Sequence, residues 1–307
     1  MSWNRGIREL SGGLLRDWPF SLSCDDAPTI GAEGRLLTED PARLDRLCDV
    51  LQAHGVRHCT AYVLGAHAEG QEDRLRRWLE AGYRLGNHTY SHRRASESTV
   101  DEFVADVHRC DELLQAVGAF ADDRPRLFRF PSLDRGATVR ERAAMADGVR
   151  SLGYTIAHAT VDLFDYLFEE PIAAAERAGD LARLDTALQR YAEVALASCA
   201  YEARHVHRQL GRTVPLIAFF HCGPTSTIGL DRVLGQLRGV RWCSQVEALA
   251  DPLYREFDAS PQFNGRVSRA MLPRDLRERV FGRLASLSTW PGLFAQRRLG
   301  PLWPFMA

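Results

Sequence analysis

Two adjacent carboxylates, Asp25 and Asp26, follow a short apolar run and are the first residues that could do chemistry. At the end of a strand, one carboxylate can bind a cation while the other stays free as a base. The cation would keep both ionised near neutral pH. The pair alone is weak evidence, because adjacent aspartates in a loop more often cap a helix or face solvent.

Two histidines four residues apart, His88 and His92, are the second candidate. On one helical turn, both imidazoles would face the same way and could chelate one ion. Neutral imidazole nitrogens suit Zn²⁺, Co²⁺ and similar ions. With Asp26 they would leave coordination positions open, as in catalytic zinc sites. Two ordinary surface or core histidines are an equally good interpretation of this motif in isolation.

Four more polar residues follow apolar runs farther along the chain. Arg129 could pair with a carboxylate at the site or make a structural ion pair. Asp162 and Asp165 could orient a histidine or cap a helix. His221 ends a dense apolar run and could be a general acid, although a satisfied core histidine is commoner.

These residues need a scaffold that brings distant parts of the chain together. Short apolar runs predict strands at residues 18–24, 56–64, 83–85, 126–130, 154–161, 214–220 and 240–243. Helical spacing predicts helices at residues 40–54, 72–81, 98–117, 138–152, 172–210 (with a break near Gly179) and 230–237. Alternation of strands and helices predicts an α/β fold with a parallel sheet. Barrels of this type build their sites at the carboxyl ends of the strands, where these polar residues lie.

Taken in order, the motifs resemble those of the polysaccharide deacetylases, the NodB-homology group or carbohydrate esterase family four. The segments that carry the resemblance are Ser23-Cys24-Asp25-Asp26-Ala27, His88-Thr89-Tyr90-Ser91-His92, Arg129-Phe130-Pro131-Ser132, Asp162-Leu163-Phe164-Asp165-Tyr166 and Phe219-Phe220-His221. The resemblance covers residues 18 to about 250. It implies a distorted (β/α) barrel of about seven parallel strands over residues 1–251, with residues 252–307 as a C-terminal extension packed on the barrel.

The resemblance implies a metal-dependent hydrolase that removes an acetyl or other small acyl group from an N-acylated sugar or small metabolite. Asp26, His88 and His92 would hold one divalent metal, Zn²⁺ by preference, with Co²⁺ or another transition metal as alternatives. Asp25 would be the general base and His221 the general acid.

The resemblance also implies two supporting residues and a set of substrate contacts. Arg129 would restrain the base, and Asp165 would hold the imidazole of the acid. Substrate contacts would come from Ser132, from Tyr166 and from Phe130, and a backbone N–H near Ser132 would stabilise the oxyanion.

Several positions depart from the family pattern. Ser132 stands where the family has Tyr, Tyr166 where it has Trp, Ala27 where it has Gly, and Cys222 where an acid often follows the histidine. These changes shape the groove and spare the metal ligands, so we expect an altered pocket and hypothesise a small substrate. An O-acetyl esterase, a cyclic-amide hydrolase on the same barrel and a non-catalytic binding module are the alternatives.

Composition further narrows the classes of partner and the cellular location that we expect for this protein. A net charge of −1 argues against a general nucleic-acid binder. Seven cysteines at irregular spacings, without a Cys-x-x-Cys pair, predict reduced buried thiols. The first residues have no signal-peptide pattern, and no apolar run reaches the length of about 18 residues that a membrane span needs. We therefore expect a cytoplasmic protein, a monomer or homodimer, whose aromatic tail at residues 286–307 packs on the protein rather than on a membrane.

Overall fold

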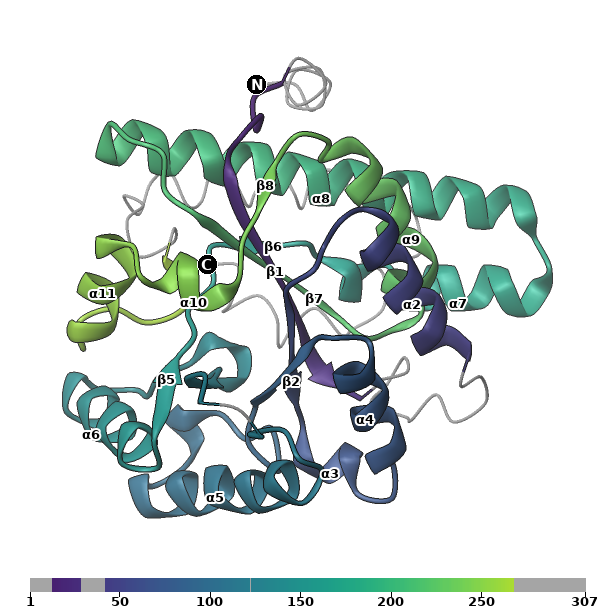
Figure 1. The fold of residues 1–307 in the computed structure, drawn as a ribbon. Helices are drawn as coiled ribbons and strands as arrows, with labels where there is room; N and C mark the ends of the chain where they lie inside the picture. The colour runs from purple at the N-terminus through teal and green to yellow at the C-terminus, as the bar shows by residue number, and fades with distance from the viewer. Residues whose placement is uncertain (1–12, 29–41, 122, 268–307) are drawn as a thin grey trace.

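Parallel strands form the centre of the molecule in the computed structural model, which describes residues 13–28, 42–121 and 123–267 (Figure 1). The strands are β1 (Pro19–Ala27), β2 (Cys59–Val63), β3 (Arg84–Asn87), β4 (Arg126–Phe128), β5 (Tyr154–Ile156), β6 (Val161–Asp162), β7 (Leu216–His221) and β8 (Arg241–Trp242). Seven of them run in the order β5-β4-β3-β2-β1-β7-β6, and β8 pairs with β1. No described residues pair β5 with β6, so the barrel is open there. The predicted distorted barrel of about seven parallel strands is confirmed.

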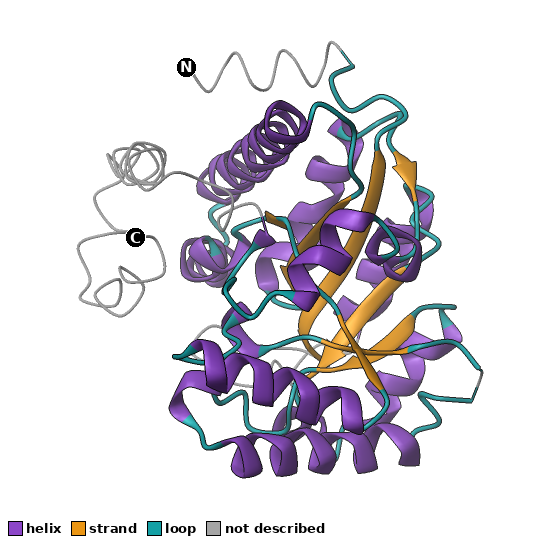
Figure 2. Ribbon diagram, turned by 90° about the vertical axis from the view of Figure 1, so that its left-hand side faces the viewer, coloured by secondary structure: helices purple, strands orange, loops and turns teal. Residues whose placement is uncertain are grey.

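Helices surround this sheet, with α5 and α6 on one side and α8 and α9 on the other (Figures 1 and 2). The helices are α2 (Ala42–Ala53), α3 (Gly65–Ala68), α4 (Glu72–Glu80), α5 (Val100–Ala116), α6 (Val139–Ser151), α7 (Glu169–Ala178), α8 (Leu181–Leu210), α9 (Pro224–Gln236), α10 (Gln245–Leu249) and α11 (Pro252–Ala259). The described helices include none that is both long and apolar enough to cross a membrane.

Strand β1 explains how the sequence positions the site. Its apolar side chains join the main hydrophobic core, whereas Ser21, Ser23 and Asp25 alternate with them and are also buried. Successive side chains of a strand point to opposite faces, so these three polar residues share one face. Strand β7 lies beside β1 in a register that places Asp25 opposite His221. The pairing therefore brings two predicted catalytic residues together.

Local signals set several helix ends as predicted. Thr99 and Glu102 form a reciprocal capping box at the start of α5. Gly179, at φ 64°, ends α7 and produces the break that was predicted between two helices. Helix α9 begins at Pro224, six residues before the predicted start, because proline is well suited to the first helical turn.

The prediction of one strand over residues 154–161 is wrong, because this segment changes partners halfway. The N–H of Ala157 donates to Phe128 of β4 at 2.7 Å, whereas the N–H of Thr160 donates to Ile217 of β7 at 2.9 Å. The segment crosses the opening of the barrel between these contacts and forms two short strands, β5 and β6. Long-range pairing, which the local pattern does not contain, decides this split.

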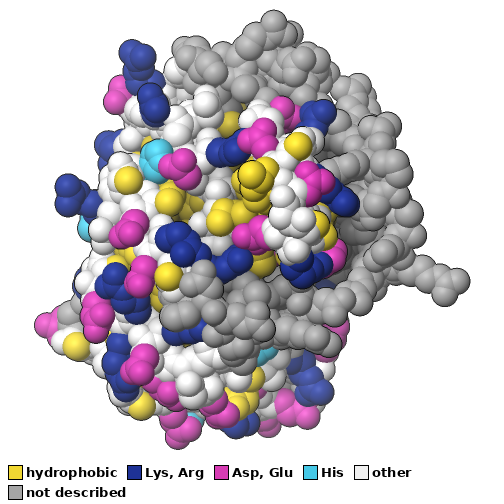
Figure 3. All heavy atoms as spheres, turned by 90° about the vertical axis from the view of Figure 1, so that its right-hand side faces the viewer, with side chains coloured by type: hydrophobic (Ala, Val, Ile, Leu, Met, Phe, Trp, Pro, Cys, Tyr) yellow, Lys and Arg dark blue, Asp and Glu magenta, His cyan; other side chains and the backbone are white. Residues whose placement is uncertain are grey.

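All seven cysteines are buried and free, as predicted. On the face that Figure 3 shows, Arg and acidic side chains are interspersed, in agreement with the small net charge. Residues 252–267 of the predicted extension pack on the barrel, and Tyr254 donates a 2.6 Å hydrogen bond to the Pro215 carbonyl. The aromatic tail at residues 286–307 lies outside the described residues.

Candidate metal centre and active site

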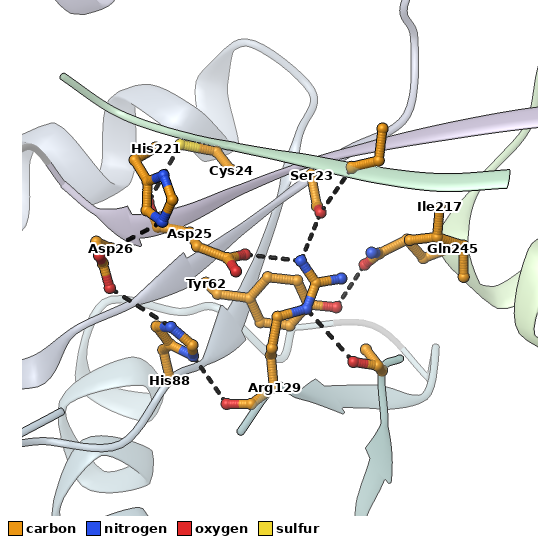
Figure 4. Close-up of polar contacts among 12 residues, drawn as sticks. Ser23, Cys24, Asp25, Asp26, Tyr62, His88, Arg129, Ile217, His221 and Gln245 are labelled. Atoms are coloured by element: carbon orange, nitrogen blue, oxygen red, sulfur yellow. Dashed lines mark hydrogen bonds and ion pairs between the residues drawn. The ribbon is translucent and has the colours of Figure 1, made fainter. Parts of the chain in front are cut away.

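Polar side chains from β1, β7 and the segments that follow β3 and β4 meet at the carboxyl end of the sheet. Figure 4 shows Asp26 between His221 and His88, with Asp25 turned toward Arg129. The first group comprises Asp26, His88 and His92, whose ligand atoms lie within 4.8 Å of one another. The Nε2 atoms of His88 and His92 approach Asp26 Oδ1 at 3.4 and 3.2 Å. We call these three residues the metal-ligand group.

A neighbouring backbone group orients His88. Its Nδ1 lies 2.8 Å from the carbonyl oxygen of Arg129. A carbonyl only accepts, so Nδ1 carries the hydrogen and Nε2 keeps its lone pair toward Asp26. Metal-binding histidines commonly have such a partner on the second ring nitrogen.

The two histidines converge for a reason other than the predicted one. Residues 88–92 form no helical turn but a loop after β3, in which Thr89 and His92 have φ of 68° and 59°. The Asn87 side chain accepts from the N–H of Thr89 at 2.9 Å, and the Thr89 hydroxyl accepts from the N–H of His92 at 3.1 Å. These local bonds hold a left-handed bend that turns His92 back toward His88, so the helical interpretation is wrong.

The electrostatics of the metal-ligand group favour positive charge beside Asp26. Burial would raise the pKa of Asp26, but the imidazoles of His92 and His88 hold it well below its usual range. Burial lowers the pKa of His88 below its ordinary value and favours the neutral imidazole that a metal requires. Asp26 Oδ1 is buried and makes no hydrogen bond with the described residues. A divalent cation fits this combination of one carboxylate oxygen and two imidazole nitrogens.

Asp25 has different surroundings from its neighbour. Arg129, which is fully buried, donates from Nη1 to Asp25 Oδ1 at 2.7 Å and to Ser23 Oγ at 2.8 Å. The guanidinium also lies over the ring of Tyr62, with its carbon 4.3 Å from the ring centroid. One oxygen of Asp25 is thereby fixed, and the structure brings Arg129 to the residue that it was predicted to restrain.

His221 forms a second hydrogen-bonded pair with Asp165, at the start of the short 3-10 helix η4 (Asp165–Leu167). Its Nδ1 lies 3.0 Å from Asp165 Oδ1, while Asp165 Oδ2 accepts from the His221 N–H at 2.6 Å and from Ser226 Oγ at 2.9 Å. We call His221 and Asp165 the acid pair. Burial would lower the pKa of His221, but Asp165 outweighs it and raises that pKa well above its ordinary value.

The two aspartates of the segment Asp162–Tyr166 contact different partners. Asp165 contacts His221, whereas Asp162 accepts from the Phe164 N–H at 2.8 Å and from the Tyr166 hydroxyl at 3.2 Å. The motif alone left open which aspartate orients a histidine, whereas the family resemblance implied Asp165. The structure brings Asp165 to His221.

The three residues predicted to contact substrate have unequal positions. Ser132 is exposed in the short 3-10 helix η3 (Pro131–Leu133), with left-handed φ and ψ of 54° and 17°. Tyr166 is 39% exposed, and its ring packs edge-on against His221 with centroids 5.5 Å apart. Phe130 instead stacks on Phe103 in a core cluster and is 3% exposed. Ser132 and Tyr166 can therefore border a substrate groove. Phe130 instead anchors the chain before η3 in the core.

The sequence reasoning missed Ser23, which shares Arg129 with Asp25, and Ser226, which donates to Asp165. The period of two in a strand could have revealed Ser23, because it shares a face with Asp25. Ser226 lies in the first turn of α9, five residues after His221, and no local pattern marks it.

Comparisons with known proteins show what part of this chain is similar to. The family model for polysaccharide deacetylases matches residues 19–155. The resemblance to the polysaccharide-deacetylase family is confirmed over these residues. A peptidoglycan-N-acetylglucosamine deacetylase of Bacillus cereus is 30% identical over 130 residues, which are 42% of this chain and 42% of that protein. The peptidoglycan-N-acetylmuramic acid deacetylase PdaC of Bacillus subtilis is 26% identical over 112 residues, 36% of this chain and 21% of that protein. The matches thus span less than half of either relative.

A solved structure extends the likeness at the level of the fold. A pseudoenzyme of the same carbohydrate esterase family, from Bacillus anthracis, aligns with a TM-score of 0.51 at 19% identity, over 76% of this chain and 66% of that one. Deacetylases of this family are metalloenzymes. The donor set of Asp26, His88 and His92 is chemically suited to such an ion.

Proposed function

We propose that this protein is a metal-dependent deacetylase that hydrolyses the N-acetyl group of an amino sugar. One observation carries the proposal: a donor set suited to a divalent cation lies between a carboxylate restrained by Arg129 and a histidine paired with Asp165. That is the division of labour that amide hydrolysis needs. The names of the two curated relatives support an N-acetylated amino sugar as the substrate class.

Asp26, His88 and His92 would hold the cation, for which we propose Zn²⁺. When bound, it would polarise the acyl carbonyl and lower the pKa of water. The chain's own residues would move the protons. Asp25, with one oxygen fixed by Arg129, would take a proton from the attacking water through its other oxygen.

The acid pair would complete the reaction. His221 Nδ1 is engaged by Asp165, so Nε2 is the atom that can donate a proton to the departing nitrogen. The carbon–nitrogen bond then breaks, and the products are acetate and the free amine. The His221 Nε2 atom lies 3.9 Å from Asp26 Oδ2, so acid and metal ligands border the same small volume.

Acetate release from purified, Zn²⁺-supplied protein tests this proposal. We propose that small N-acetylated amino sugars are better substrates than polymers, because Ser132 and Tyr166 alter the groove. N-acetylglucosamine, its oligomers and peptidoglycan fragments should be compared at equal acetyl concentration, with Asp25→Asn as the inactive control. Absence of acetate from all of them, or equal release by the control, would contradict the proposed function. Preference for the longest oligomers would contradict only the size of the substrate.

A further inference from the structure

The last described residues, 260–267, pass from the loop that follows η3 to the segment between β5 and β6, at the opening of the barrel. Near their end, the N–H of Val267 donates to the Ala159 carbonyl at 3.0 Å, in the segment that joins the two strands. We call residues 260–267 the C-terminal strap. It lies beyond residues 19–155, which match the family model, so the family pattern does not account for it.

The helix before the strap, α11, is fastened to the loop that follows η3. The guanidinium of Arg135, a residue 2% exposed, donates to the carbonyls of Phe257 at 3.2 Å, Asp258 at 3.2 Å and Ser260 at 3.4 Å. A cation is favourable at this end of a helix, where carbonyl groups lack intrahelical partners. Arg135 therefore ties the loop to the point where the strap begins.

The strap itself contacts the same loop through Asn264 and Gly265. Asn264 Oδ1 accepts from the Arg135 N–H at 2.7 Å, and Asn264 Nδ2 donates to Asp134 Oδ1 at 3.1 Å. The N–H of Gly265 donates to the Leu133 carbonyl at 3.1 Å. Three consecutive residues, 133–135, are thus held by two residues of the strap.

The loop needs such support because its backbone is strained. Ser132 and Leu133 have φ of 54° and 56°, a region that residues other than glycine seldom adopt. Such conformations persist only where the surrounding structure fixes them, and they concentrate at functional sites. Asp134 also accepts from the N–H of Ser96 at 3.0 Å, on the segment after His92. Asp134 therefore links the strap and the strained turn to the segment that follows His92.

We propose that the C-terminal strap is a positioning element of the active site. In it, Asn264 fixes Asp134 and Arg135 and thereby holds the preceding Ser132–Leu133 turn against the groove. The inference rests on the proposed function, since this turn would supply the backbone N–H that meets the developing oxyanion. A donor of this kind acts in the transition state, so its displacement lowers kcat and leaves KM almost unchanged.

Two exposed strap residues provide a matched test. Asn264→Ala removes the side-chain bonds to Asp134 and Arg135, which follow the turn, and Gln262→Ala leaves these bonds in place. We expect Asn264→Ala to lower kcat about five- to twentyfold with KM within about twofold, and Gln262→Ala to match the wild type. Hydrogen exchange should become faster in residues 131–136 of Asn264→Ala alone, at unchanged metal content.

The outcomes separate this inference from the proposed function. Unchanged exchange in residues 131–136, an equal effect of Gln262→Ala, or a rise in KM at constant kcat would overturn the positioning role. A wild-type protein that releases no acetate would overturn the proposed function, while the exchange measurement would still decide whether Asn264 holds the turn.

Discussion

The metal-ligand group and the acid pair lie side by side but are held in opposite ways. In the acid pair, Asp165 receives three hydrogen bonds and is fully buried. In the metal-ligand group, two imidazole nitrogens point at Asp26 Oδ1, which makes no hydrogen bond with the described residues. A satisfied network fixes the orientation of one imidazole, whereas a buried carboxylate oxygen faced by two imidazole nitrogens is a donor set suited to a cation. This contrast is why we propose that the acid pair moves a proton and that the metal-ligand group holds an ion.

Asp25 belongs to neither of these two groups, and its loss should have the largest effect on activity. Asp25→Asn keeps the shape and removes the base, so we expect kcat/KM to fall about 10³-fold. Zn²⁺ content should remain that of the wild type, because Asp25 is not in the metal-ligand group. Steady-state kinetics and metal analysis of the same sample check both halves of the prediction. A variant that lost both activity and metal would merge the two roles that the comparison separates.

Replacement of Asp165 should impair the acid pair and leave the metal content unchanged. In Asp165→Asn the carboxylate that raises the pKa of His221 is gone, so that pKa falls. His221 must be protonated to act as the acid, so the alkaline limb of the kcat/KM profile should move to lower pH. We expect a loss of about 30- to 100-fold at the optimum. Ser226→Ala, which removes one donor to Asp165, is the milder control.

An alkaline limb at the wild-type pH in Asp165→Asn would show that the limb belongs to another group. The acid pair would then have no part in the pH dependence, and the contrast with the metal-ligand group would lose its functional meaning.

Tyr166 borders both the acid pair and the groove, and its hydroxyl should matter least. The ring packs on His221, while the hydroxyl donates to Asp162 at the partly exposed rim. Tyr166→Phe keeps the ring, so we expect a change in kcat/KM of only about two- to fivefold. Tyr166→Ala removes the ring as well and should cost more. Equal losses in both variants would assign the effect to the hydroxyl rather than to the aromatic wall.

The residues of both groups could be predicted from the sequence because each follows an apolar strand. The rule that parallel strands present their carboxyl ends at one edge predicted that Asp25, Arg129 and His221 lie together, and the family resemblance implied their roles. The alternation of strands and helices predicted an α/β fold with a parallel sheet, and the family resemblance implied the barrel.

Other parts depend on contacts that no local pattern encodes. The loop at residues 88–92 turns because Thr89 and His92 have left-handed backbone conformations. Hydrogen bonds that the side chains of Asn87 and Thr89 accept stabilise these conformations. The split between β5 and β6 follows from pairing with two different strands. The contact between Asn264 and Arg135 joins residues 129 positions apart, so it could be found only in the folded chain.

Metal content is the most direct test of the account. Purified wild-type protein supplied with Zn²⁺ should hold about one ion per chain by elemental analysis. His88→Ala should hold less than about a tenth of that amount, because one of two imidazole ligands is lost. His108→Ala, in which an exposed histidine outside the site is replaced, should keep the wild-type content. Wild-type metal content in His88→Ala, or a wild-type protein that binds no ion, would contradict the metal centre on which the proposed function depends.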